Sequence, residues 1–144
     1  MQLKLYYSVL YDWVLGAVLQ VFRTKSFRRF QRKEGISDGS LSEAINRAER
    51  GLIDADLGHG LIKQRVARSG QGRSGGFRTV IAYRVRERAV FLFGFAKSDQ
   101  ANLSKADESD LKAYGALLLA LDARGINTMI AGHELTEVTY DEKA

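Results

Sequence analysis

Nine lysine and arginine residues lie between Leu61 and Lys97 of this 144-residue chain, and one acidic residue, Glu87, accompanies them. Guanidinium and ammonium groups bind phosphate and stabilise negative charge that develops during a reaction. A surface this basic repels itself unless a polyanion lies against it. We therefore expect the stretch to bind a polyanion, with RNA as the leading candidate. Its basic residues are Lys63, Arg65, Arg68, Arg73, Arg78, Arg84, Arg86, Arg88 and Lys97.

The elements that carry these side chains are predicted to be β-strands. Runs rich in β-branched and aromatic residues occupy 60–68, 77–86 and 89–96, and turn-like segments separate them. This pattern indicates an antiparallel meander of three strands. In an extended strand Lys63 and Arg65 share one face. The run 89–96 is almost wholly apolar, as expected of a central strand buried on both faces.

Further elements are expected before the meander. A first strand is predicted at 19–23, and a short helix at 25–34 is predicted to end at Gly35. Ser40 and Glu43 form a capping box, which predicts the start of a second helix that closes at Gly51. The segment 53–60 is predicted to be a loop. The fold class expected is α+β, with a small twisted antiparallel sheet of three to four strands, two N-terminal helices and a C-terminal helix.

The C-terminal helix is predicted to begin at Ser104, whose side chain is a suitable cap, and to end near Arg124. A weak strand is expected at 134–138 and frayed residues at 141–144. The chain divides into an apolar N-terminal extension at 1–20, a body at 21–124 and a tail at 125–144. The apolar residues expected to form the buried stripe of the helix are Leu111, Tyr114, Leu117, Leu118 and Leu121.

The extension at 1–20 allows several interpretations. Lys4 and Asp12 within it disfavour a transmembrane helix, and they also make it a poor signal peptide. The favoured interpretations are an additional helix or strand packed on the body, or a translation start placed upstream of the true one.

The amino-acid composition limits the kinds of site that the chain can form. There is no cysteine, which is consistent with the reducing cytoplasm, and the two histidines, His59 and His133, lie far apart in the sequence. We therefore expect no metal site and no cofactor.

The net charge is distributed unevenly along the chain. Residues 21–97 carry a net charge of +10 and residues 98–144 carry −5. This asymmetry favours a basic binding face and an acidic opposite side, against the alternative of a merely basic structural domain.

One motif points to a function that its context rejects. The segment from Gly70 to Gly75 matches the dinucleotide fingerprint G-x-G-x-x-G in every position. That fingerprint binds pyrophosphate only where the loop opens a helix. Here the loop precedes the strand predicted from Phe77, so we interpret it as a hairpin connection whose Arg73 reaches a ligand.

The order of these elements and several short motifs resemble the RelE/HigB-type toxins of bacterial type II toxin–antitoxin systems, in the RelE/ParE superfamily. The resemblance runs from about Val21 to about Leu121. The motifs that carry it are Val-Phe-Arg-Thr-Lys at 21–25, Arg-Lys-Glu-Gly-Ile at 32–36, Ala-Glu-Arg-Gly-Leu at 48–52, Gly-Leu-Ile-Lys-Gln-Arg-Val-Ala-Arg at 60–68, Arg-Ser-Gly-Gly-Phe-Arg-Thr at 73–79 and Phe-Gly-Phe-Ala-Lys at 93–97.

The resemblance implies a growth-inhibiting, metal-independent endoribonuclease, an mRNA interferase that cuts mRNA in the ribosome and that a cognate antitoxin neutralises. By position, Lys63 and Arg65 match the paired basic residues of the family's second strand, Arg78 matches its phosphate-binding arginine, and Lys97 matches the basic residue at the end of its last strand. These four are the candidate catalytic residues. Arg68, Arg73 and Arg84 are candidate RNA contacts. We expect no membrane partner.

The chain departs from the RelE pattern at two positions. The RelE branch carries an arginine just after the matching lysine and a tyrosine several residues later, where this chain has Ser98 and, approximately, Ser104. No histidine falls in the basic cluster. An alternative function therefore stays open, in which the protein binds RNA or a protein target without cleavage, as an inactive toxin or a ParE-like topoisomerase poison.

Overall fold

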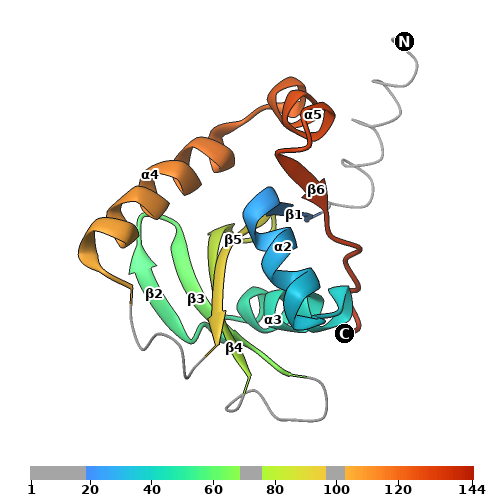
Figure 1. Cartoon of the computed structure of the whole chain (residues 1–144), viewed down its shortest axis with the longest axis vertical. Coiled ribbons are helices and arrows are strands. Elements are labelled where there is room, and N and C mark those ends of the chain that lie inside the picture. The colour runs from blue at the N-terminus through green and yellow to red at the C-terminus, as the bar shows by residue number, and fades with distance from the viewer. Residues whose placement is uncertain (1–18, 69–75, 97–102) are drawn as a thin grey trace.

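The computed structural model describes residues 19–68, 76–96 and 103–144, and element labels follow Figure 1. The described part forms a mixed six-stranded sheet with strand order β2-β3-β4-β5-β1-β6. Only β1 and β5 pair in parallel, and every other pair is antiparallel. The elements are β1 (Gln20–Thr24), α2 (Lys25–Glu34), α3 (Asp38–Glu49), β2 (Ala55–Gly58), β3 (Leu61–Val66), β4 (Phe77–Arg84), β5 (Arg88–Ala96), α4 (Lys105–Ala120), α5 (Ala123–Ala131) and β6 (Leu135–Glu137).

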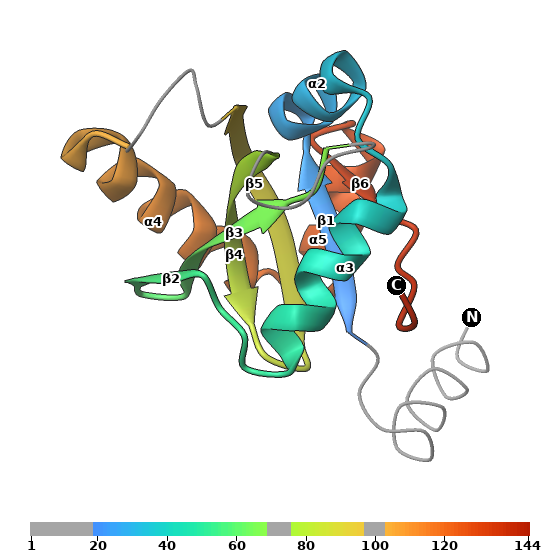
Figure 2. The same cartoon turned by 90° about the horizontal axis from the view of Figure 1, so that it is seen from below.

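Helices cover both faces of the sheet. Figure 2 shows α4 on one side of the sheet and α2 and α3 on the other. Each face has its own apolar core: Phe27, Leu41 and Ile45 lie in the first, and Leu118 and Ile126 lie in the second. Because side chains alternate along a strand, β3, β4 and β5 contribute to both cores.

The expected fold class is confirmed as α+β, but the expected sheet was too small and wholly antiparallel. The described residues hold six strands and four helices. The sequence-based count missed β2, which forms within the segment 53–60, and it missed the parallel pairing of β1 with β5. Parallel pairing joins segments that are remote in the sequence, so no local turn motif predicts it.

Several local predictions are confirmed. The helix α2 has the expected bounds and ends at Gly35, whose φ of 68° is the left-handed conformation that glycine adopts readily. The three-strand meander is present as β3, β4 and β5, and β5 lies in the interior of the sheet between β4 and β1. Ser104 caps α4 by accepting a hydrogen bond from the backbone N–H of Asp107. The helix α3, however, begins at Asp38, two residues before the predicted capping box, with Ser37 as its cap.

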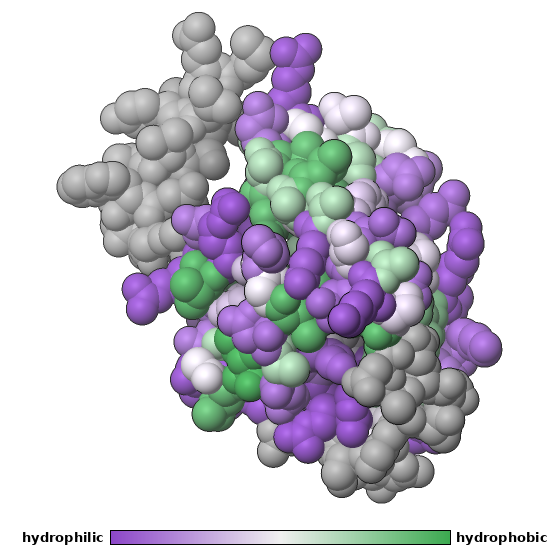
Figure 3. All heavy atoms as spheres, turned by 90° about the vertical axis from the view of Figure 1, so that its left-hand side faces the viewer, coloured by the Kyte–Doolittle hydropathy of each residue, from purple (hydrophilic) through white to green (hydrophobic). Residues whose placement is uncertain are grey.

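The predicted C-terminal helix was wrong in its length and in its buried face. It ends at Ala120, and Asp122 caps a separate helix, α5. Tyr114 and Leu117 are exposed, and the buried positions include Gly115 instead. A Cβ at Gly115 would lie 3.1 Å from the Cβ of Ala82, so the helix contacts the sheet closely at this glycine. Because glycine has no side chain, the hydrophobic pattern of the sequence does not indicate this contact. Hydrophobic side chains on the side of the molecule shown in Figure 3 form patches among hydrophilic ones.

The C-terminal residues, expected to fray, are instead attached to α3. The Nδ2 of Asn46 donates to the carbonyl oxygens of Asp141 (2.9 Å) and Ala144 (3.1 Å). The Oγ of Ser42 accepts from the backbone N–H of Asp141 at 3.0 Å. Both partners on α3 are buried, so the tail supplies hydrogen bonds that these side chains could not obtain from water.

The interpretations of the segment 1–18 concern residues outside those that the structure describes. The predictions for Arg73, Lys97, Ser98 and the motif that begins at Gly70 also concern residues outside the described ranges. Within the described ranges, no helix is both long and apolar enough to cross a membrane.

The position of α2 against the sheet depends on Gly94 of β5. The ring of Phe30 occupies the space into which a Cβ at this position would project. We expect Gly94→Ala to lower the free energy of unfolding by about 1–3 kcal/mol, because the added methyl displaces the ring. Chemical denaturation measures the change. Gly39→Ala in α3 is the control, since its Cβ would meet only Ser37 Oγ at 3.6 Å. A Gly94→Ala protein as stable as the wild type would contradict this packing.

Candidate functional site

Pairing of β3 with β4 brings three of the predicted site residues together. In this antiparallel register Lys63 lies opposite Val80, and Arg65 lies opposite Arg78. Val80 belongs to the core under α4, so Lys63, Arg65 and Arg78 share that face of the sheet. All three side chains are partly exposed, because they lie beyond the residues that α4 buries.

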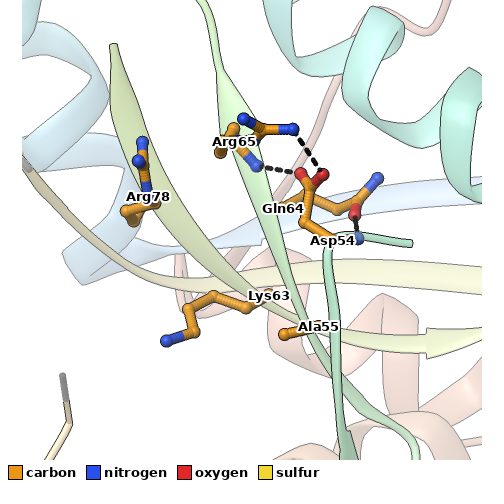
Figure 4. Close-up of a pocket in the computed structure, with 6 residues that line it drawn as sticks. All are labelled: Asp54, Ala55, Lys63, Gln64, Arg65 and Arg78. Carbon is orange, nitrogen blue, oxygen red and sulfur yellow. Dashed lines mark hydrogen bonds and ion pairs between the residues drawn. The ribbon is translucent and has the colours of Figure 1, made fainter. Parts of the chain in front are cut away.

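These side chains line a pocket of about 280 Å³ (Figure 4). The guanidinium of Arg65 turns toward Asp54, whereas the amine of Lys63 points away from it and Arg78 lies on the neighbouring strand. Three cations and one carboxylate therefore face one small volume. The lining residues are Asp54, Ala55, Lys63, Gln64, Arg65 and Arg78.

Asp54 fixes the position of Arg65 at two points. One carboxylate oxygen of Asp54 accepts the backbone N–H of Arg65 at 2.7 Å, and the other accepts Nη2 of the same residue at 3.1 Å. A guanidinium held in this way keeps its remaining N–H groups for another acceptor. The sequence-based prediction missed this role of Asp54.

Two buried side chains in turn fix the position of Asp54. Arg47 of α3 donates to the Asp54 carboxylate at 3.2 Å, to Glu43 at 2.6 Å and to the carbonyl oxygen of Arg65. The Oε1 of Gln64 accepts the backbone N–H of Asp54 at 2.7 Å, and its Nε2 donates to Ala44 of α3 at 2.9 Å. The pocket therefore rests on a polar network that joins α3, the start of β2 and β3.

The network also keeps Asp54 ionised. Burial alone would raise the pKa of this carboxyl, but hydrogen bonds from Arg65 and Arg47 outweigh burial and lower the pKa below its usual value. One negative charge thus stays in the pocket at neutral pH, where the guanidinium groups neutralise it.

The remaining cations of the pocket lack such partners among the described residues. The Nη1 of Arg78 is buried and has no hydrogen-bond partner within those ranges. No ion pair of Lys63 occurs there either. A buried guanidinium nitrogen without an acceptor is costly, and a bound anion would satisfy it.

The structure places the other predicted contacts elsewhere. Arg68 lies beyond the end of β3, with its guanidinium 4.7 Å from the centre of the Phe77 ring. Arg84 lies at the far end of β4 from Arg78, where it donates to the carbonyl oxygen of Leu119 at 3.3 Å and pairs with Glu87 at 3.5 Å. Its neighbour Arg88 also binds carbonyl oxygens at the end of α4. Arg84 therefore contacts the end of a helix and lies apart from the pocket.

A sequence signal for Asp54 existed in the turn that follows it. Gly58 and Gly60 both have positive φ, and they permit a tight turn between β2 and β3. Pairing outward from that turn sets Ala55 opposite Lys63 and brings the preceding aspartate beside β3.

Within the described part of the chain, no group of three His, Asp or Glu side chains is arranged to hold a metal ion.

The fold and pocket define a small α+β protein with a cationic site on the edge half of its sheet. A family model for the RelE toxin of the RelE / RelB toxin–antitoxin system matches residues 19–138. The chain belongs to this RelE toxin family, which confirms the resemblance found in the sequence, and membership implies an antitoxin partner. No curated protein matches the chain significantly.

The link between Asp54 and its two arginines predicts a pH-dependent contribution to stability. We expect Asp54→Asn to lower the free energy of unfolding at neutral pH by about 1 kcal/mol, a modest value because the carboxylate is partly solvated. The native carboxyl has the lower pKa, so its contribution is full above the unfolded pKa. The deficit of the variant should therefore shrink as the pH falls below about 4.

Denaturation of both proteins at several pH values measures this difference. Asp110→Asn on α4 is the control, because this exposed carboxylate has no ion pair or hydrogen bond from its side chain to described residues. A deficit for Asp54→Asn that stays constant down to pH 2 would show that the charge of Asp54 is not the cause.

Proposed function

We propose that this toxin is a metal-independent endoribonuclease that cleaves mRNA, in a translation-dependent manner, and that the cationic pocket on β3 and β4 is its active site. The observation that carries the proposal is the convergence of Lys63, Arg65 and Arg78, with Arg78 Nη1 buried and lacking an acceptor among the described residues. Family membership supports the toxin class.

The reaction that we propose depends mainly on positively charged groups in the active site. The 2′-hydroxyl of one nucleotide attacks the adjacent phosphorus, and the bond from phosphorus to the 5′-oxygen breaks. The products are a 2′,3′-cyclic phosphate and a 5′-hydroxyl. Negative charge accumulates on the phosphate oxygens in the transition state, and fixed cations stabilise it.

Each side chain then has a role. Arg78 binds the scissile phosphate, and Arg65, held by Asp54, donates its free N–H groups to the same phosphate. We assign to Lys63 the donation of a proton to the departing 5′-oxygen, since its amine extends into the pocket away from Asp54. The proton of the 2′-hydroxyl passes to water. Lys97, which lies outside the described residues, stays a candidate for the fourth basic group.

A second function is supported by Ser104. At the position approximately matching the family's tyrosine, its Oγ accepts a hydrogen bond from Asp107 as the cap of α4. Ser104 therefore does not supply the tyrosine of the RelE branch, and binding of RNA or of a protein target without cleavage, as an inactive toxin or a ParE-like topoisomerase poison, is the alternative. In either case, we propose that the antitoxin covers the cationic pocket with an acidic segment.

Cleavage by purified protein tests the proposal. We expect the wild type to cut mRNA on programmed ribosomes, in a buffer that contains the Mg²⁺ that ribosomes require. Metal independence is tested separately on naked RNA in EDTA, where any cutting that the protein shows should persist. Arg78→Ala should reduce the rate at least about 100-fold, as expected for loss of a preorganised group that stabilises transition-state charge. Gel analysis of end-labelled RNA measures the rate and identifies the cyclic phosphate.

Arg124→Ala is the matched control, because this exposed arginine lies on α5 and forms no ion pair with described residues. It should cut at the wild-type rate. Undiminished cutting by Arg78→Ala would place the chemistry elsewhere, whereas RNA binding without cutting by the wild type would favour the alternative function.

A further inference from the structure

We propose that the exposed face of α2 is a second RNA-binding surface, on the opposite side of the sheet from the pocket, and that it binds the phosphate backbone of a folded RNA. This surface goes beyond the proposed function, because its binding does not require that the pocket cleave.

The charge of α2 is the first observation. Five of its ten residues are basic, one is acidic, and all five basic side chains are exposed. Several of them are three or four residues apart, where like charges repel each other across one turn. A polyanion removes that repulsion. The five residues are Lys25, Arg28, Arg29, Arg32 and Lys33.

The second observation is that none of these five side chains forms an ion pair or hydrogen bond with the described residues. Arginines with structural roles in this protein are paired. Arg23 binds Asp38 at 2.7 Å, and Arg47 binds Glu43 at 2.6 Å. The other unpaired cations on the described surface are scattered over several elements. The density of free cations therefore distinguishes α2 from the remaining surface.

The helix displays these cations on a rigid support. Phe27 on its inner face is 1% exposed, and Phe30 packs edge-on against Phe77 with ring centres 5.5 Å apart. Thr24 and Gly35 cap its two ends. Residues four apart rise about 6 Å along a helix, which is comparable with the separation of successive phosphates in an RNA strand. Arg28 with Arg32, and Arg29 with Lys33, form two such pairs.

The surface is hollowed beside one of these pairs. Arg28 and Arg32 border a depression of about 200 Å³, whose other lining residues include Arg23 and Asp38. The Asp38 carboxylate accepts hydrogen bonds from Arg23 and from Gln31, both at 2.7 Å, so its charge is already neutralised. The depression is therefore compatible with a phosphate group.

The composition of the face favours RNA over an acidic protein. Its exposed residues are the five cations and Ser26, with no exposed apolar side chain. Protein interfaces have an apolar centre, whereas nucleic-acid backbones are bound by charge and hydrogen bonds. Since α2 and the pocket lie on opposite faces of the sheet, a strand in the pocket cannot also cover α2. A folded RNA is large enough to contact both.

The experiment compares two variants of the full chain that lose the same charge. In the first, all five α2 cations become glutamine: Lys25→Gln, Arg28→Gln, Arg29→Gln, Arg32→Gln and Lys33→Gln. In the control, five scattered exposed cations are replaced: Arg50→Gln, Arg86→Gln, Lys105→Gln, Arg124→Gln and Lys143→Gln. The probe is a 2′-O-methylated RNA hairpin, which cannot be cleaved through its 2′-hydroxyl. Its dissociation constant is measured over a range of salt concentrations.

We expect the α2 variant to bind the hairpin at least about tenfold more weakly than the control, with the slope of log affinity against log salt reduced by about 3 to 4. Equal losses in both variants, or wild-type binding by the α2 variant, would overturn the proposal. Circular dichroism verifies folding, and the pair Arg29→Gln/Lys33→Gln serves if the fivefold variant unfolds. Because the probe resists cleavage, a failure of the ribonuclease function leaves this result unaffected.

Discussion

The pairing of β3 with β4 sets Arg65 directly opposite Arg78, so that two positive charges lie on the same face of the sheet. Like charges in such cross-strand pairs destabilise a sheet. One carboxylate, Asp54, neutralises Arg65, and within the described ranges no partner neutralises the buried nitrogen of Arg78. Among the described residues, Arg78 thus keeps an unsatisfied guanidinium nitrogen beside an open pocket. An anionic ligand would relieve this unfavourable contact, which links the packing of the sheet to the function that we propose for the pocket.

The rest of the structure maintains that arrangement. On one face α3 holds the pocket through Arg47 and Gln64, whose side chains are buried and hydrogen-bonded. On the other face α4 contacts the sheet through Gly115, near Leu61 and Ala82, and so leaves the cationic end of the strands uncovered. Rigid support matters because preorganised charges need no rearrangement when negative charge develops on a substrate.

Local features of the fold could be predicted from the sequence, and long-range contacts could not. The bounds of α2, the cap at Ser104 and the meander follow from short-range patterns of residues. The same alternation placed Lys63 and Arg65 on one face. The parallel pairing of β1, the bond between Asp54 and Arg65, and the contact of Arg84 with the end of α4 all join residues remote in the sequence. Their charges and types were visible, but no local pattern identified the partners of β1 or Arg84, and the only local signal for Asp54 was the glycine turn that pairs β2 with β3.

We propose that the pocket of this RelE-family toxin cuts mRNA. The most direct test of this proposal is to map the 5′ ends of mRNA in growing cells after induction of the wild type and of the Lys63→Ala/Arg78→Ala double variant. We expect growth arrest with new 5′ ends inside translated frames for the wild type, and neither effect for the folded double variant. Growth arrest with intact mRNA, or the same cuts from the double variant, would contradict it.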